Sequence, residues 1–104
     1  MTDATTALID AISVTFVTFR VEEIRSRSWV SATFAGVRHE LTFTTEGEGA
    51  EASADLFLDG LAEREFDLRD HVLADIGVVS RSTSPGADGP LVRISLEALT
   101  VEEG

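Results

Sequence analysis

Residues 11–44 read AISVTFVTFRVEEIRSRSWVSATFAGVRHELTFT, and this stretch decides the fold. Apolar and polar residues alternate in both of its halves, which is the pattern of half-buried β-strands. The polar residues 25–28 between the halves predict a tight turn, so that the two strands form one long antiparallel hairpin. Four apolar residues then pair across the ribbon: Phe19 with Phe34, and Val21 with Ala32.

The apolar side of this predicted ribbon changes half-way along its length. Apolar residues before position 17 lie on one side, and those after it lie on the opposite side, where Phe19 faces Phe34. Because side chains alternate strictly along a strand, such a change requires a bulge, a sharp coil or burial on both faces. We expect it where Val17 faces Gly36, since a glycine inside a strand often marks a bulge.

The second apolar side of the ribbon needs a cover, because one short helix cannot cover both sides. A second copy of the chain would bury an exposed patch of this kind, and we therefore expect a homodimer. The alternative is cover from Leu8 and Ile9, or from the later strands of the same chain.

The rest of the chain predicts one helix and a second hairpin. Apolar residues recur at helical spacing over residues 50–64: Ala50, Ala54, Phe57, Leu58 and Leu61. Residues 71–81 and 91–103 flank a loop rich in Pro and Gly, and one face of this hairpin is apolar from Val72 to Val78 and from Ile94 to Thr100. The order β-β-α-β-β predicts an α+β domain, in which two antiparallel hairpins form a four-stranded sheet with one helix packed on one face. We expect residues 1–104 to form a single domain, with residues 1–7 frayed.

The composition excludes several classes of function. The chain of 104 residues has a net charge of −11, which argues against binding to nucleic acid or an anionic membrane and permits a basic protein partner. It has no cysteine, which excludes disulfides, thiolate catalysis and cysteine-held metals. We expect no cofactor and no metal. The N-terminal sequence lacks the features of a secretory signal, so we expect a cytoplasmic protein.

Four residues are candidates for ligand binding: His39, His71, Asp75 and Glu97. His39 lies on the apolar side of the first hairpin, either as a polar anchor in a pocket or as a structural histidine. His71 and Asp75 would share a metal-binding face only in a helix, and the predicted strand separates them. Asp75 faces Glu97 in the predicted second hairpin, as a pair of acids or as surface charges balanced by Arg69 or Arg93.

Trp29 lies near the first turn beside Arg25 and Arg27, and this composition is typical of protein–protein hot spots. The alternative is that its ring covers the end of the helix. The predicted interface comprises Phe19, Val21, Arg25, Arg27, Trp29, Ala32 and Phe34. The leading hypothesis is a non-enzymatic, cytoplasmic, self-associating interaction domain. The alternative is a small-molecule-binding or hydrolytic domain with a cleft between sheet and helix, anchored by His39.

Overall fold

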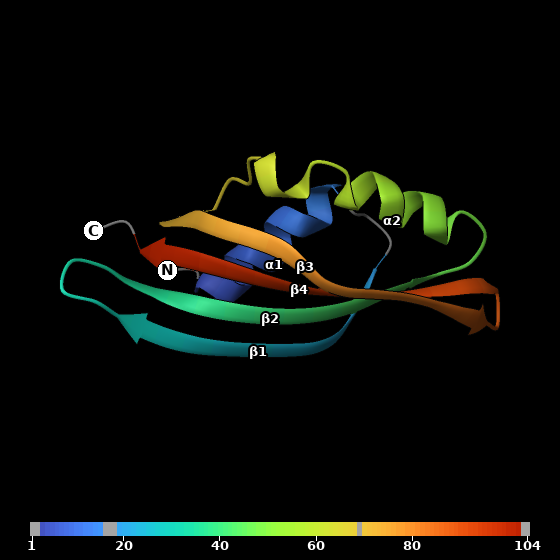
Figure 1. The fold of residues 1–104 in the computed structure, drawn as a ribbon, viewed down its shortest axis with the longest axis horizontal. Helices are drawn as coiled ribbons and strands as arrows, with labels where there is room; N and C mark the ends of the chain where they lie inside the picture. The colour runs from blue at the N-terminus through green and yellow to red at the C-terminus, as the bar shows by residue number, and fades with distance from the viewer. Residues whose placement is uncertain (1–2, 16–18, 69, 103–104) are drawn as a thin grey trace.

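A computed structural model of the chain describes residues 3–15, 19–68 and 70–102. These residues form two α-helices, α1 (Ala4–Thr15) and α2 (Ala50–Leu58), and a short 3-10 helix, η1 (Leu61–Glu63). They also form four strands: β1 (Arg20–Val30), β2 (Ala35–Glu46), β3 (His71–Gly86) and β4 (Gly89–Glu102). The strands make one antiparallel sheet in the order β1-β2-β4-β3 (Figure 1). The predicted α+β class and the two hairpins on either side of a helix are confirmed, and α1 is an additional helix.

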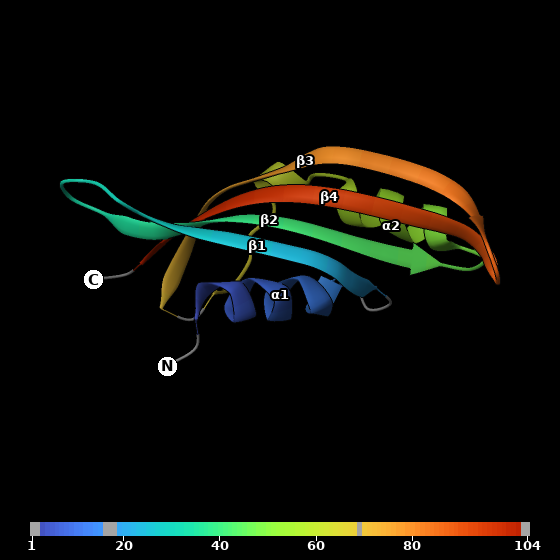
Figure 2. The same cartoon turned by 90° about the horizontal axis from the view of Figure 1, so that it is seen from below.

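Both helices cover the same face of the sheet, which we call the inner face (Figure 2). Alternate residues of β2 and β4 point into the core on this face: Leu41, Phe43, Val92, Ile94, Leu96 and Ala98. The helices contribute Leu8 and Ile12 from α1 and Ala54 and Phe57 from α2. The opposite, outer face carries mostly polar residues and has no covering layer among the described residues.

Helix α1 replaces the first part of the predicted hairpin. Its buried residues include Ala4, Leu8 and Ile12, which lie one turn apart on one helical face. Asp3 begins the helix, because its Oδ1 accepts a hydrogen bond of 2.8 Å from the backbone N–H of Thr6. Residues 4–7 are therefore helical, and the expectation that they are frayed is wrong. Apolar and polar residues alternate in the sequence after Ile12. This alternation resembles the pattern of a strand, although residues 13–15 belong to α1.

The first hairpin exists, but its predicted register is wrong. The turn lies at residues 31–34 instead of 25–28, and it closes with a hydrogen bond of 2.7 Å from the backbone N–H of Ser31 to the carbonyl oxygen of Phe34. Trp29 therefore pairs with Gly36, and Arg27 pairs with Arg38. Residues 25–28 are extended because they pair with residues 37–40 of β2, which in turn pairs with β4 from Gly36 to Glu46.

The predicted pairs of Phe19 with Phe34 and of Val21 with Ala32 are consequently wrong. Val21 pairs with Phe43, and the ring of Phe19 packs on that of Phe43 with their centroids 5.2 Å apart. Both residues thus point toward the inner face, where the core can bury them. The predicted partner of Gly36, Val17, lies outside the described residues.

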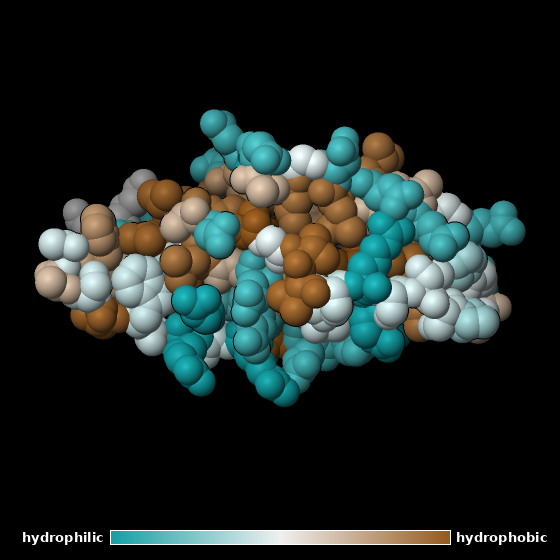
Figure 3. All heavy atoms as spheres, viewed as in Figure 1, coloured by the Kyte–Doolittle hydropathy of each residue, from teal (hydrophilic) through white to brown (hydrophobic). Residues whose placement is uncertain are grey.

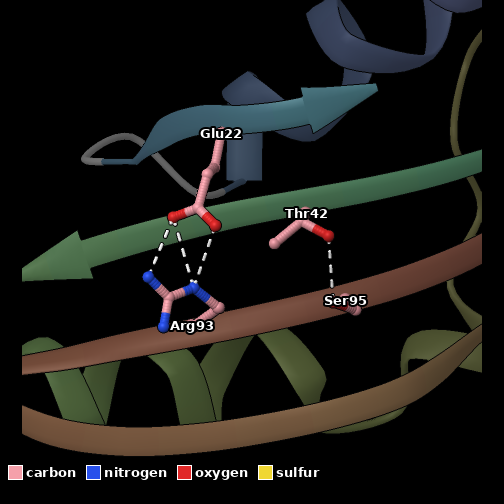
Figure 4. Close-up of polar contacts among 4 residues, drawn as sticks. All are labelled: Glu22, Thr42, Arg93 and Ser95. Carbon is pink, nitrogen blue, oxygen red and sulfur yellow. Dashed lines mark hydrogen bonds and ion pairs between the residues drawn. The ribbon is translucent and has the colours of Figure 1, made fainter. Parts of the chain in front are cut away.

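The predicted bulge occurs in β1, at Glu22 instead of opposite Gly36. Val21 pairs with Phe43 and Glu23 with Thr42, so Glu22 is the extra residue. The bulge turns the side chain of Glu22 across the outer face of β2, and its carboxylate accepts two hydrogen bonds of 3.0 Å from Arg93 of β4 (Figure 4). Beside this pair, the hydroxyls of Thr42 and Ser95 lie 2.9 Å apart.

Helix α2 and the second hairpin follow the sequence more closely. Helix α2 buries the predicted residues Ala50, Ala54 and Phe57, but it ends at Leu58 instead of Arg64. The helix ends there because the next residue, Asp59, has an extended backbone, and Gly60, whose left-handed backbone has a φ of 66°, then leads into η1.

The predicted buried face of β4 is confirmed from Ile94 to Thr100. On β3, however, Ile76 is the one fully buried residue, because β3 is an edge strand with two bulges. These bulges also shift the register by one to three positions from the predicted one. The predicted loop 82–90 is mostly strand, and a two-residue turn between Gly86 and Gly89 closes the hairpin.

Candidate functional site

His39 is fully buried where α1, β1 and β4 meet β2. Its Nε2 lies 2.9 Å from the hydroxyl of Thr100, which donates a hydrogen bond of 3.3 Å to the carbonyl oxygen of Val37. Its Nδ1 lies 3.3 Å from the hydroxyl of Thr5 and 3.4 Å from that of Ser26. One side chain thus links three strands to the first turn of α1.

The surroundings of His39 favour its neutral form. Burial lowers the pKa of His39, the nearby His71 lowers it further, and the carboxylate of Asp3 opposes the shift. Because both ring nitrogens have hydroxyl neighbours and the ring has no solvent exposure, a ligand would have to displace packed side chains to reach it. The arrangement is that of a structural histidine in a polar network.

The structure separates the other candidate ligand residues. Asp75 pairs with Leu99, and Glu97 pairs with Gly77, so the predicted pairing of Asp75 with Glu97 is wrong. His71 lies in β3 as predicted, and it borders a groove together with Asp75. Within residues 3–15, 19–68 and 70–102, no three histidine or carboxylate side chains gather in a geometry that would hold a metal ion.

The predicted interface residues divide into two groups. Phe19 and Val21 contribute to the inner face, as described above. The other five lie along β1 or at the tip of its hairpin: Arg25, Arg27, Trp29, Ala32 and Phe34. We call residues 29–36 the arm, because they form the projecting end of the first hairpin, in which Gly36 is the last residue of β2 that pairs with β4 (Figure 2). The molecule is elongated in consequence, with extents of 48 × 23 × 21 Å.

The arm exposes two large apolar side chains at its tip. Val30 is 81% exposed and Phe34 is 59% exposed. The tip is nevertheless well hydrogen-bonded, because the hydroxyl of Ser31 accepts the backbone N–H of Phe34 at 3.0 Å. Figure 3 shows hydrophobic residues at this end of the molecule and hydrophilic side chains along the edge formed by β1. The arm therefore presents apolar groups on an ordered backbone.

Trp29 covers the base of the arm. Its indole ring lies over Gly36, where a Cβ atom would come within 2.9 Å of two ring carbons. The indole N–H is buried and has no hydrogen-bond acceptor among the described residues, which costs about 1–3 kcal/mol relative to a satisfied donor. A partner that moved the indole outward would relieve this cost.

Two arginines lie side by side at the base of the arm. Arg27 and Arg38 are directly paired across β1 and β2 on the outer face, and both are exposed. Like charges in this position repel each other, and no carboxylate of the described residues forms an ion pair with either side chain. Sequence reasoning missed Arg38 and Val30 because their positions beside Arg27 and Phe34 depend on the register of the hairpin.

Comparisons of the chain with protein-family models, with curated proteins and with solved structures find no match. In the described part of the chain, neither helix has the length and apolar character that crossing a membrane requires.

Proposed function

We propose that this protein is a non-enzymatic interaction domain that self-associates through the arm. The observation that carries this proposal is the exposure of Val30 and Phe34 on an ordered, projecting hairpin tip. A cytoplasmic location remains an expectation from the sequence.

An ordered apolar tip suits a protein partner. Burial of a valine or phenylalanine side chain contributes on the order of 1.5–3 kcal/mol. The hydrogen bonds between Ser31 and Phe34 already fix the tip, so little conformational entropy is lost when a partner binds. Such rigid apolar groups with nearby Trp and Arg side chains are typical of binding hot spots.

The charge of the arm favours a second copy of the chain as the partner. Arg27 and Arg38 make the base of the arm cationic, whereas the whole chain carries a net charge of −11. Opposite potentials across an interface favour association and fix its orientation. A basic protein partner, which the composition permits, would bind to the acidic surfaces outside the arm.

The alternative function, a ligand-binding or hydrolytic domain anchored by His39, has less support. The burial of His39 and its hydroxyl neighbours give a ligand no open approach to the ring. Asp75 pairs with Leu99 and Glu97 with Gly77, so the two carboxylates do not face each other, and neither is a hydrogen-bond neighbour of His39.

The proposal is tested by the solution mass of the protein across a hundredfold dilution, measured by light scattering after gel filtration. We expect a dimer that dissociates on dilution, and we expect the V30S/F34S variant to remain monomeric. The matched control is Leu56→Ser, which removes an apolar side chain that is 74% exposed on α2, far from the arm in the sequence. A wild-type monomer at every concentration, or equal dissociation of both variants, would contradict the proposal.

A further inference from the structure

A groove lies beside the edge strand β3, at the same end of the molecule as the arm. It has a volume of about 640 Å³ and runs between the start of β3 and residues 62–68. Its apolar lining includes Phe66, Val72 and Leu73. Val72 is 48% exposed, so the groove offers apolar surface to a partner.

The rim of the groove is acidic. Glu65, Asp67 and Asp75 border it, and all three side chains are exposed. Arg64 also borders the groove, but its guanidinium donates hydrogen bonds of 3.1 and 2.8 Å to the backbone carbonyls of Leu56 and Asp59. The positive charge of Arg64 therefore lies against the C-terminal end of α2. The exposed charged side chains on the described part of the rim are negative.

The strand pairing places the arm and the groove in one row across the sheet. Trp29 pairs with Gly36, Gly36 with Val101, and Val101 with Val72. The arm thus lies on one side of β4 and the groove on the other. A two-fold axis that passes between them brings each arm to the groove of the other copy, which gives a closed and self-complementary interface.

We propose that the arm of one copy docks in the groove of a second copy, and that the reverse contact forms at the same time. Val30 and Phe34 fill the apolar part of the groove, and Arg27 and Arg38 meet the acidic rim. The charges of the two surfaces are opposite: two arginines that form no ion pair with the described residues face a rim with three exposed carboxylates. This inference rests on the proposed self-association and names the surface that receives the arm.

Two charge-reversal variants test the proposal together. The first is R27E/R38E, which makes the base of the arm acidic. The second is D67R/D75R, which makes the rim of the groove basic. Each variant alone brings like charges together in both contacts of its homodimer, so we expect its dissociation constant to rise by about a hundredfold or more.

An equimolar mixture of the two variants should form a heterodimer. In that pair the acidic arm of the first variant meets the basic groove of the second, while the remaining arm and groove keep their wild-type charges. Native mass spectrometry distinguishes the heterodimer from both homodimers by mass. The control E48R/D10R changes the net charge as much as D67R/D75R does, at exposed positions away from the arm and the groove, and should dimerise like the wild type.

Recovery of a dimer only in the mixture supports the docking of arm in groove. A mixture that stays monomeric, or single variants that dimerise like the wild type, overturns this docking while the arm-dependent dimer of the wild type still stands. A wild-type protein that is monomeric throughout overturns the proposed self-association as well.

Discussion

Lowering the pH from about 7.5 to about 5.5 should destabilise the protein through His39. The ring is buried among hydroxyl groups, and its pKa is lowered from 6.5 mainly by burial and further by the nearby His71. The carboxylate of Asp3 acts in the opposite direction. Because the unfolded chain binds a proton at His39 more readily than the folded chain does, stability rises with pH. The contribution is complete above pH 6.5 and is lost as the pH falls from 6.5 toward the lower pKa of the folded state.

The size of the effect follows from the uptake of one proton on unfolding. The free energy of unfolding can fall by at most about 1.4 kcal/mol per pH unit below the unfolded pKa. One unit below 6.5, the loss therefore reaches at most about 1.4 kcal/mol. That is a substantial part of the 5–15 kcal/mol that is typical of small domains.

Denaturant titrations at several pH values measure this loss, with the fluorescence of Trp29, the one tryptophan of the chain, as the probe. The comparison is His39→Gln, which keeps a polar group of similar length beside Thr100 but does not titrate. The other ionisable groups are the same in both proteins, so the difference between them isolates His39. We expect the wild type to lose more stability than the variant between the two pH values. Equal losses in both proteins would show that protonation of His39 is not linked to unfolding.

Three further predictions concern the sheet. Gly36→Ala should lower the free energy of unfolding, measured by denaturant titration, by about 3 kcal/mol or more, because the new Cβ would overlap a backbone carbonyl of β4. Gly77→Ala should leave the free energy of unfolding nearly unchanged, since a Cβ at that position meets no atom within 4 Å. Ile94→Ala should lower the free energy of unfolding by about 2–5 kcal/mol, since the side chain is fully buried; a loss below 1 kcal/mol would show that the core relaxes around the gap. A double-mutant cycle on Glu22 and Arg93 should show a small favourable coupling that disappears in about 1 M salt, and a coupling unaffected by salt would refute its electrostatic origin.

The second half of the chain was largely predictable because the spacing of its apolar residues fits only one kind of element in each segment. The buried residues of α2 recur at helical spacing, and those of β4 alternate strictly, since both elements bury a single face. The end of α2 at Leu58 and the length of the second hairpin were less predictable. They depend on a left-handed backbone position and on bulges that sequence spacing does not reveal.

The first half misled prediction because α1 and β1 are both amphipathic and stand close together in the sequence. The spacing of Ala4, Leu8 and Ile12 contains the helical signal, and Asp3 contains the capping signal. The alternation that begins at Ile12 favours a strand when it is considered alone. That misassignment lengthened the first strand, moved the turn to residues 25–28 and paired the wrong residues.

The candidate site was likewise predictable only in part. Trp29 with its neighbouring arginines indicated an interaction surface from the sequence, which stays a prediction; the structure adds that Phe34 is 59% exposed. The pairing of Arg27 with Arg38 and the groove beside β3 were not predictable. Both depend on register, and a shift of one residue moves every side chain of a strand to the other face.

The sequence by itself determined the α+β class, the pairing of neighbouring strands into two hairpins, and the inward-facing residues of α2 and β4. These follow from local periodicity, because the spacing of apolar residues directly reports which face an element buries. The tertiary structure alone decided the position of α1, the register of both hairpins and the burial of His39. These features depend on which elements pack on the inner face. That packing brings together residues far apart in the sequence, so the spacing of nearby residues does not reveal it.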